Sequence, residues 1–230
     1  LPNNRPLYEH QVESIQKVVK GRNLLVATGT GSGKTEAFLL PIINYLLAEG
    51  NAGTLNEPGV RTLLLYPMNA LANDQVKRLR QLLTVFPEIT FGRYTGETKK
   101  DTKSALEDYR AQFGELPLKN ELISREQIQQ KPPHILITNF AMLEYLLLRP
   151  EDTSLFDGAS GRHWKFIVLD EVHTYQGAKG GEIAMLLKRV RDRVHASEKS
   201  RIQYIGTSAT IGDSHDATVG ERSLEGSPLP

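Results

Sequence analysis

The chain of 230 residues has a formal net charge of +1, with 39% hydrophobic and 24% charged residues, values ordinary for a globular protein. The length suits one α/β domain with insertions, and the absence of cysteine excludes disulfides and thiolate metal sites in this chain. No run of about 18 apolar residues occurs, so we expect no membrane-spanning helix, no membrane partner and a cytoplasmic location. Because the bulk charge is nearly neutral, any nucleic-acid surface has to be a local face.

Short apolar segments alternate with segments of helical periodicity along the chain. The segments predicted to form strands are almost continuously hydrophobic, as strands buried on both faces of a sheet are, and span residues 23–27, 62–66, 89–94, 134–138, 166–170 and 203–207. Helices are predicted at residues 34–47, 70–83, 141–148 and 181–194. This alternation predicts a three-layer α/β fold with a mostly parallel central sheet and helices on both faces.

Three segments depart from the alternation. Residues 97–131 are polar, with a helical stretch at residues 102–113, and are interpreted as an insertion between strands whose mobility is left open. Residues 49–59 contain Gly, Asn and Pro and are expected to form a loop. Residues 211–230 are rich in Gly, Ser, Asp and Pro, so we expect a linker or disordered tail after a domain spanning residues 1–210.

A glycine-rich segment, TGTGSGKT at residues 28–35, follows the first predicted strand and precedes a predicted helix. This order of elements is the context that a phosphate-binding loop requires. Lys34 is expected to reach the β- and γ-phosphates of a nucleotide, and Thr35 to bind Mg²⁺ through its hydroxyl. The residues expected to surround the phosphates are Thr30, Gly31, Ser32, Gly33, Lys34 and Thr35. Thr28 replaces the first glycine of the strict pattern, and a flexible Gly/Ser turn before an ordinary helix is the alternative.

Two adjacent carboxylates, Asp170 and Glu171, stand at the end of the strand predicted at residues 166–170. The carboxyl ends of parallel strands form the ligand site in α/β proteins. Asp170 is therefore expected to hold Mg²⁺, and Glu171 to orient or deprotonate the attacking water. A solvated strand end is the alternative, and the upstream phosphate loop favours the catalytic interpretation.

Six motifs in a fixed order resemble those of DExH-type superfamily 2 helicases over about residues 5–210. YEHQ at residues 8–11 resembles the adenine-reading Q motif, TGSGKT at 30–35 motif I and YPMNALANDQ at 66–75 motif Ia. TNFAML at 138–143 falls where motif Ib is expected, DEVH at 170–173 looks like motif II, and SAT at 208–210 is identical to motif III. The run DEVHTYQG followed by GGE resembles the YprA-like subgroup, whose members often carry a zinc-binding C-terminal domain.

The resemblance implies the first RecA-like domain of a helicase, with ATP and Mg²⁺ as cofactors. It implies that Gln11 reads the adenine edge and that His173 couples the γ-phosphate site to motif III. It also implies that Ser208 and Thr210 link the state of the nucleotide to domain closure. A second RecA-like domain in the same polypeptide completes the ATP site in this family.

The resemblance further implies a nucleic-acid partner, with DNA favoured over RNA, across the ends of the strands. Hydroxyl, amide and backbone N–H groups there contact phosphates without reading sequence. The candidate residues are Pro67, Asn69, Thr95, Gly96, Thr138 and Asn139. Lys77, Arg78 and Arg80 are candidates for a local basic face beside motif Ia, and a solvated helix surface is the alternative.

The leading hypothesis is an ATP-dependent nucleic-acid helicase or translocase. A nucleic-acid-binding module with a degenerate motor is the alternative from another class, and the presence of Lys34, Thr35, Asp170 and Glu171 argues against it. A P-loop kinase or GTPase is a third, which motif III and the Q-like segment disfavour. The isolated chain is expected to be nearly inactive. Related groups act in DNA repair or in anti-phage defence, and the sequence does not choose between these pathways.

Overall fold

The structure is a computed structural model that describes residues 6–29, 31, 33–195 and 202–209. Thr30, Ser32 and Thr210, as well as the expected tail at residues 211–230, lie outside the described residues. In the described part of the chain, seven strands form one sheet in the order β1-β7-β6-β2-β5-β3-β4, and every neighbouring pair is parallel. The strands are β1 Leu24–Ala27, β2 Thr62–Tyr66, β3 Phe91–Arg93, β4 Glu121–Leu122, β5 Ile135–Asn139, β6 Phe166–Leu169 and β7 Gln203–Ser208.

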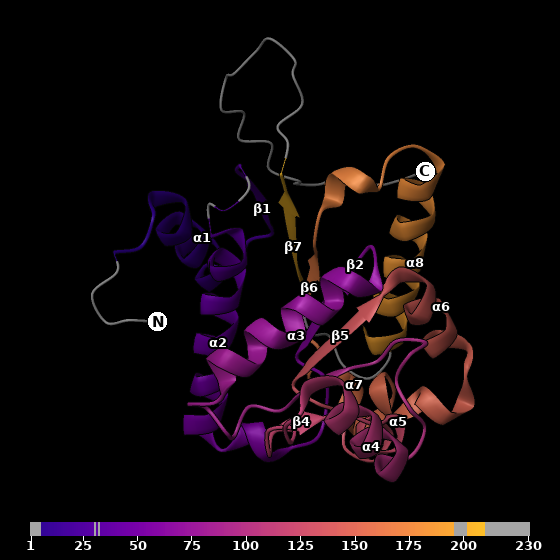
Figure 1. Ribbon diagram of the computed structural model, residues 1–230. Coiled ribbons are helices and arrows are strands. Elements are labelled where there is room, and N and C mark those ends of the chain that lie inside the picture. Colours follow the sequence, from indigo (N-terminus) through magenta and orange to yellow (C-terminus); the bar gives the residue numbers. More distant parts are fainter. Residues whose placement is uncertain (1–5, 30, 32, 196–201, 210–230) are drawn as a thin grey trace.

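Helices cover both faces of this sheet (Figure 1). The described helices are α1 Glu9–Val19, α2 Lys34–Ala52, α3 Asn69–Leu83, α4 Thr102–Phe113, α5 Arg125–Gln130, α6 Phe140–Leu148, α7 Gly158–Gly161 and α8 Ala178–His195, with 3₁₀ turns η1 Thr54–Asn56, η2 Pro150–Leu155 and η3 Val172–Thr174. Leu64 and Tyr66 of β2 join a core cluster with α1, α2 and α3. Leu63 and Leu65 face the opposite way and join a cluster with α5, α6 and α8. The period-two alternation of a strand therefore divides the core into two layers, and the predicted three-layer fold is confirmed.

The six predicted strands and four predicted helices are all present, with ends that differ by a few residues. The largest difference is in α2, which continues to Ala52, so the loop expected at residues 49–59 is wrong in its first part. Glu49 lies in this added part of α2, and its carboxylate accepts a hydrogen bond from Arg61 Nε at 2.9 Å. Gly53 then ends the helix with a φ of 78°, a conformation that favours glycine.

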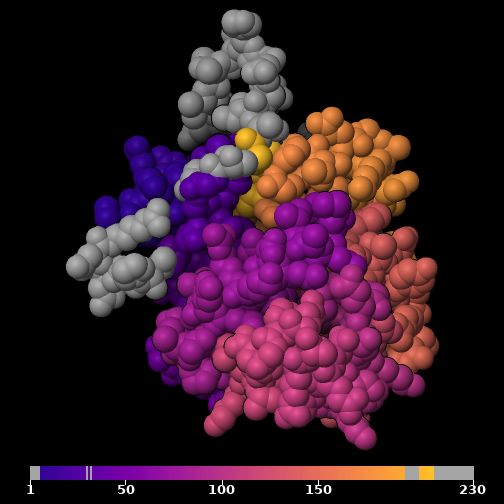
Figure 2. Space-filling model, in the orientation of Figure 1, coloured from indigo at the N-terminus to yellow at the C-terminus, as the bar shows by residue number. Residues whose placement is uncertain are grey.

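Residues 97–131 form an ordered helix–strand–helix unit. Helix α4 coincides with the helical stretch predicted from the sequence, and Asp101 caps it by accepting a hydrogen bond from Ser104 N at 2.8 Å. Strand β4 pairs with β3 and extends the sheet by one strand, which the sequence did not indicate because two residues show no periodicity. The segment, magenta to pink in Figure 2, forms a continuous surface against α3. It is therefore part of the fold and not a loose excursion.

Candidate nucleotide site and nucleic-acid face

The glycine-rich loop leads from β1 to the first turn of α2, as the strand–loop–helix pattern predicts. Gly31 and Gly33 have φ values of 77° and 80°, in the left-handed region. The positive φ at Gly33 favours glycine, and a Cβ added there would also lie 2.4 Å from Gln11 Nε2 and displace that side chain. Lys34 Nζ donates to the carbonyl oxygens of Thr28 at 2.8 Å and of Gly29 at 3.3 Å. The ammonium group is thus held over the loop, where phosphate oxygens would lie.

Gln11 joins α1 to the glycine-rich loop. Its side chain is buried, its Oε1 accepts from Tyr8 N at 3.0 Å, and its Nε2 donates to the Gly33 carbonyl oxygen at 3.1 Å. A carboxamide retains one further N–H and one further lone pair after these bonds. The structure therefore places Gln11 beside the loop, and its reading of adenine stays a prediction.

A cavity of about 240 Å³ opens between α1, the loop and α3. Its lining residues are Pro6, Leu7, Tyr8, Gln11, Gly31, Gly33, Lys34, Thr35, Glu36 and Arg78. Arg78 reaches it from α3, and its Nη2 lies 3.7 Å from Glu36 Oε1. The sequence made Arg78 a candidate for a basic face beside motif Ia, and in the structure Arg78 lines the nucleotide cavity. Helical periodicity gives no indication of which way so long a side chain extends.

Asp170 and Glu171 follow β6 and are fixed by Thr207, a residue that the sequence analysis missed. The Asp170 backbone N–H donates to the Leu65 carbonyl oxygen at 3.0 Å, and Thr207 Oγ1 donates to the Asp170 carboxylate. Thr207 Oγ1 also accepts from Glu171 N at 3.3 Å. Burial raises the pKa of Asp170, and the bond from Thr207 opposes this shift. Thr207 directly precedes motif III in the sequence, and this position could have identified it as a site residue.

Glu171, His173 and Ser208 come together as the motif resemblance implies. Glu171 has a φ of 52° and is the one residue other than glycine with positive φ in the described ranges. This strained conformation turns its carboxylate toward His173, whose Nδ1 lies 3.2 Å from Glu171 Oε2. The same Nδ1 lies 3.3 Å from Ser208 Oγ. A continuous polar connection therefore joins the end of β6 to the end of β7, and its coupling role stays a prediction.

Two buried tyrosine hydroxyls near Asp170 have no hydrogen-bond partner among the described residues, those of Tyr66 and Tyr175. Burial, and after it the negative charge of Asp170, raises the pKa of both phenols. Both hydroxyls are therefore protonated and available to donate to an oxygen ligand near Asp170. The sequence analysis gave neither tyrosine a role, although Tyr66 begins motif Ia and Tyr175 follows motif II.

The proposed nucleic-acid residues divide into exposed and buried groups. Asn69 begins α3 and Asn139 caps α6, and Asn139 Nδ2 donates to Asn69 Oδ1 at 2.6 Å. Asn69 Nδ2 donates to Glu97 Oε1 at 3.0 Å. Pro67 is partly exposed and Gly96 exposed. These four residues lie where a ligand can reach them, at or just beyond the carboxyl ends of β2, β3 and β5.

Thr95 and Thr138 are fully buried in this structure, and their contact with nucleic acid stays a prediction. Thr138 Oγ1 donates to the Tyr94 carbonyl oxygen at 2.6 Å, and Thr95 N donates to Thr98 Oγ1 at 3.0 Å. The bond from Thr138 ties β5 to the end of β3, and the bond from Thr95 to Thr98 closes a turn in the loop that follows β3. The sequence pattern did not reveal this because a buried and an exposed threonine at a strand end look alike.

The three basic residues that are candidates for a face beside motif Ia have different surroundings in the structure. Arg80 Nη1 and Nε contact Glu115 at 2.8 Å and Glu121 at 3.0 Å, so this residue joins α3 to residues 97–131. Lys77 and Arg78 are both exposed: Lys77 Nζ lies 3.6 Å from Asp74 Oδ1, and Arg78 also lines the nucleotide cavity. No helix in the described part of the chain is long and apolar enough to cross a membrane.

The residues expected to hold Mg²⁺, Thr35 and Asp170, fit a hard cation by their chemistry. Both supply oxygen atoms, which are the ligands that Mg²⁺ prefers. Asp170 lies at the end of β6 with one carboxylate oxygen held by Thr207, and Thr35 stands in the first turn of α2. Burial raises the pKa of Asp170, and a nearby cation would stabilise the ionised form of this carboxylate.

Comparisons with known proteins agree with this arrangement. The DEAD/DEAH box helicase family matches residues 8–218. The chain is 30% identical to the Druantia protein DruE of Escherichia coli, over 94% of this chain and 16% of DruE. It is 32% identical to the uncharacterized ATP-dependent helicase YprA of Bacillus subtilis, over 97% of this chain and 25% of YprA.

Solved structures show the same likeness. The crystal structure of the DUF1998 helicase MrfA bound to DNA and AMPPNP has a TM-score of 0.67 and 28% identity, over 92% of this chain and 25% of MrfA. The chain thus spans a quarter or less of the length of the relatives named here. By its matched motifs and its all-parallel sheet, the chain belongs to the DEAD/DEAH box helicase family and forms the first RecA-like domain of a superfamily 2 helicase.

Proposed function

We propose that this chain binds MgATP and a nucleic-acid backbone as one half of an ATP-driven helicase or translocase. The observation that carries the proposal is the order β1-β7-β6 in the sheet. Ala27 is level with Ser208, and Leu169 with Gly206. The phosphate loop, motif III and motif II therefore emerge from the same edge of three neighbouring strands, where α/β proteins bind ligands.

In this proposal the chain's own groups divide the work of phosphoryl transfer. Lys34 exchanges the two carbonyl oxygens that it now holds for phosphate oxygens of ATP. Thr35 and Asp170 would hold Mg²⁺, which neutralises negative charge on the phosphates when bound. Glu171 accepts a hydrogen bond from the attacking water and orients it. When Glu171 binds or releases the attacking water, its contact with His173 changes. His173 in turn contacts Ser208 at the end of β7 and so couples the two strand ends.

The proposed nucleic-acid contact is formed by Asn69, Asn139, Pro67 and Gly96. Amide and backbone groups contact phosphates whatever the base sequence, so binding is sequence-tolerant and weakens as salt rises. DNA is favoured over RNA, with support from the solved MrfA structure, which is described as bound to DNA.

A second RecA-like domain elsewhere in the polypeptide is part of the proposal. The lengths of the relatives, of which this chain spans 16% to 25%, leave room for such a domain. In phosphoryl transfer, an arginine that contacts the transferring group contributes a rate factor of about 10³ to 10⁵. We propose that the second domain supplies this arginine.

The test is steady-state hydrolysis by the full-length protein with ATP or GTP, each with and without single-stranded DNA. We expect ATP to be hydrolysed in preference to GTP, and DNA to stimulate the rate. The control is Lys34→Ala, which should lose MgATP binding because it removes the cation that contacts the phosphates. Hydrolysis of GTP in preference to ATP would indicate a GTPase. DNA binding without any hydrolysis would indicate a degenerate motor.

A further inference from the structure

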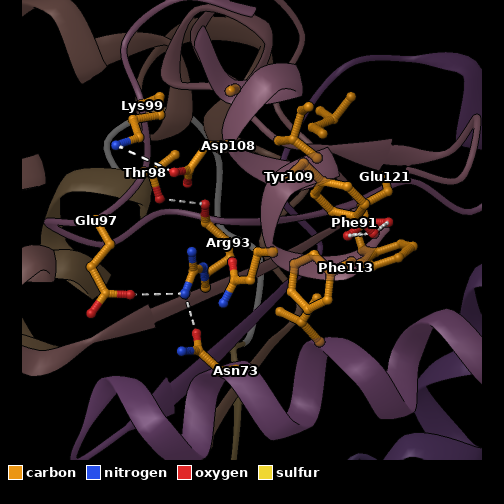
Figure 3. A pocket seen from close by; sticks show the side chains of 15 residues that line it. Asn73, Phe91, Arg93, Glu97, Thr98, Lys99, Asp108, Tyr109, Phe113 and Glu121 are labelled. Carbon is orange, nitrogen blue, oxygen red and sulfur yellow. Dashed lines mark hydrogen bonds and ion pairs between the residues drawn. The ribbon is translucent and has the colours of Figure 1, made fainter. Parts of the chain in front are cut away.

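A second cavity lies outside the nucleotide site, between α3, α4 and the sheet edge formed by β3 and β4 (Figure 3). Its volume is about 60 Å³, which at roughly 10–15 Å³ for each water is room for about four to six water molecules. Phe91, Ala105 and Tyr109 form a buried floor, while Glu97 and Gln112 are exposed at the rim. The cavity is therefore open to solvent at its rim.

The charged groups that line this cavity already have partners. Arg93 Nη1 lies 3.0 Å from Glu97 Oε2, and Lys99 Nζ lies 3.7 Å from Asp108 Oδ1. Glu121, which is buried, lies 3.0 Å from Arg80 Nε. Because these charges offset one another, the cavity suits a neutral ligand better than an anion or a cation.

Aromatic rings and polar side chains line the same cavity. Tyr109 and Phe113 have ring centroids 4.7 Å apart with planes tilted by 48°. Figure 3 shows both rings on one side and Arg93, Glu97 and Asn73 on the other. Asn73 and Gln112 carry donors and acceptors together. Aromatic faces with adaptable hydrogen-bonding groups are the chemistry that proteins use for unpaired nucleobases.

The cavity is connected to the proposed nucleic-acid face. Asn73 follows Asn69 by one turn of α3, a rise of about 6 Å. A series of hydrogen bonds runs from Asn139 through Asn69, Glu97 and Arg93 to Asn73. A strand whose backbone contacts Asn69 and Asn139 therefore has a neighbouring base within reach of the rim.

We propose that this cavity holds one unpaired nucleobase of the bound strand. The inference rests on the proposed nucleic-acid contact at Asn69 and Asn139. The base lies against Tyr109 and Phe113, and the amides of Asn73 and Gln112 meet its polar edge. Such a site holds the strand in register with α3 without selecting a long base sequence.

The test uses the full-length protein and short single-stranded DNA oligonucleotides in which one abasic nucleotide is moved along the strand. Affinity is measured by fluorescence anisotropy. Contact between a base and aromatic side chains changes affinity by roughly 5- to 150-fold, and we expect a loss of this size at one position of the abasic nucleotide. Ala105→Phe fills the cavity and should abolish the position dependence, while Ala111→Phe, on the exposed side of α4, should retain it.

A third variant does not depend on filling the core. Gln112→Ala removes an exposed amide and should weaken binding of the intact strand but not of the strand that lacks the critical base. The series of abasic oligonucleotides, measured with the parent protein, tests whether one base position contributes to binding even if Ala105→Phe does not fold. An equal affinity at every abasic position, with binding that still weakens with salt, would overturn the cavity inference alone. Absence of any binding would overturn the proposed nucleic-acid contact as well.

Discussion

Arg78 extends from α3 into the nucleotide cavity, where it is loosely paired with Glu36 at 3.7 Å. ATP is an anion, so we expect Arg78→Ala to weaken ATP binding. The Arg78 side chain is 43% exposed, which reduces the expected effect to about five- to tenfold. Lys77→Ala is the matched control, because Lys77 lies on the same helix outside the cavity. Titration of both variants with a fluorescent ATP analogue measures the difference, and equal affinities would remove Arg78 from the site.

His134 shows how burial sets the response of a single residue to pH. Its Nδ1 accepts from Thr90 N at 3.0 Å, and its Nε2 lies 2.9 Å from the Leu55 carbonyl oxygen, so both ring nitrogens are used by the neutral form. Burial, with the nearby charge of Arg61, lowers the pKa of His134 to about 4 from 6.5. The unfolded chain therefore takes up a proton between pH 6.5 and 4 that the folded chain does not.

The folded state should lose stability as pH falls through this window, by at most about 3 kcal/mol from His134. Urea unfolding of the chain at pH 7 and pH 4 measures this loss. His134→Gln, which does not titrate, should show a smaller difference between the two pH values. If the variant and the parent lose stability in parallel, His134 is not the group responsible.

At the scale of elements, Arg61 joins the end of α2, the turn η1 and the start of β2. Its buried guanidinium donates to Glu49 Oε2 at 2.9 Å and to the carbonyl oxygens of Thr54, Glu57 and Gly59. Arg61→Met should lower the free energy of unfolding by about 3–5 kcal/mol, because it leaves Glu49 and these carbonyl groups without their donor.

Arg189→Met is the matched control for Arg61→Met, because Arg189 is 46% exposed and lies 3.9 Å from Glu144. An exposed pair of this kind contributes at most about 1 kcal/mol. Chemical denaturation of both variants measures the difference. Losses of similar size in the two would show that Arg61 does not hold these elements together.

The sequence predicted those elements whose pattern lies within a short stretch of the chain. The phosphate loop needs a strand, glycines and a helix in direct succession, and β2 and α4 have the predicted bounds because their patterns are local. Contacts between residues far apart in the sequence could not be predicted. Thr207 lies 37 residues from Asp170, and Gln11 lies 22 residues from Gly33. Strand β4 was missed because two residues have no pattern to recognise, and the burial of Thr95 and Thr138 depends on neighbours from other elements.

At the scale of the whole molecule, the nucleotide site occupies one edge of the sheet. We propose that the arginines that stabilise the transferring phosphoryl group come from a second domain, so the isolated chain should hydrolyse ATP slower than the full-length protein by about 10³- to 10⁵-fold. Phosphate release by the purified chain with MgATP and single-stranded DNA measures this rate. Nucleic-acid-stimulated turnover equal to that of the full-length protein would show that the catalytic groups are complete within this chain.

The proposed motor depends on Glu171, whose φ of 52° turns its carboxylate toward His173. The most direct measurement compares ATP binding and ATP hydrolysis in full-length Glu171→Gln with those of the parent protein. The amide preserves size but is a poor proton acceptor, so we predict unchanged ATP affinity and a turnover lowered by about 10²- to 10⁴-fold. A variant that hydrolyses ATP at the parent rate would contradict the account.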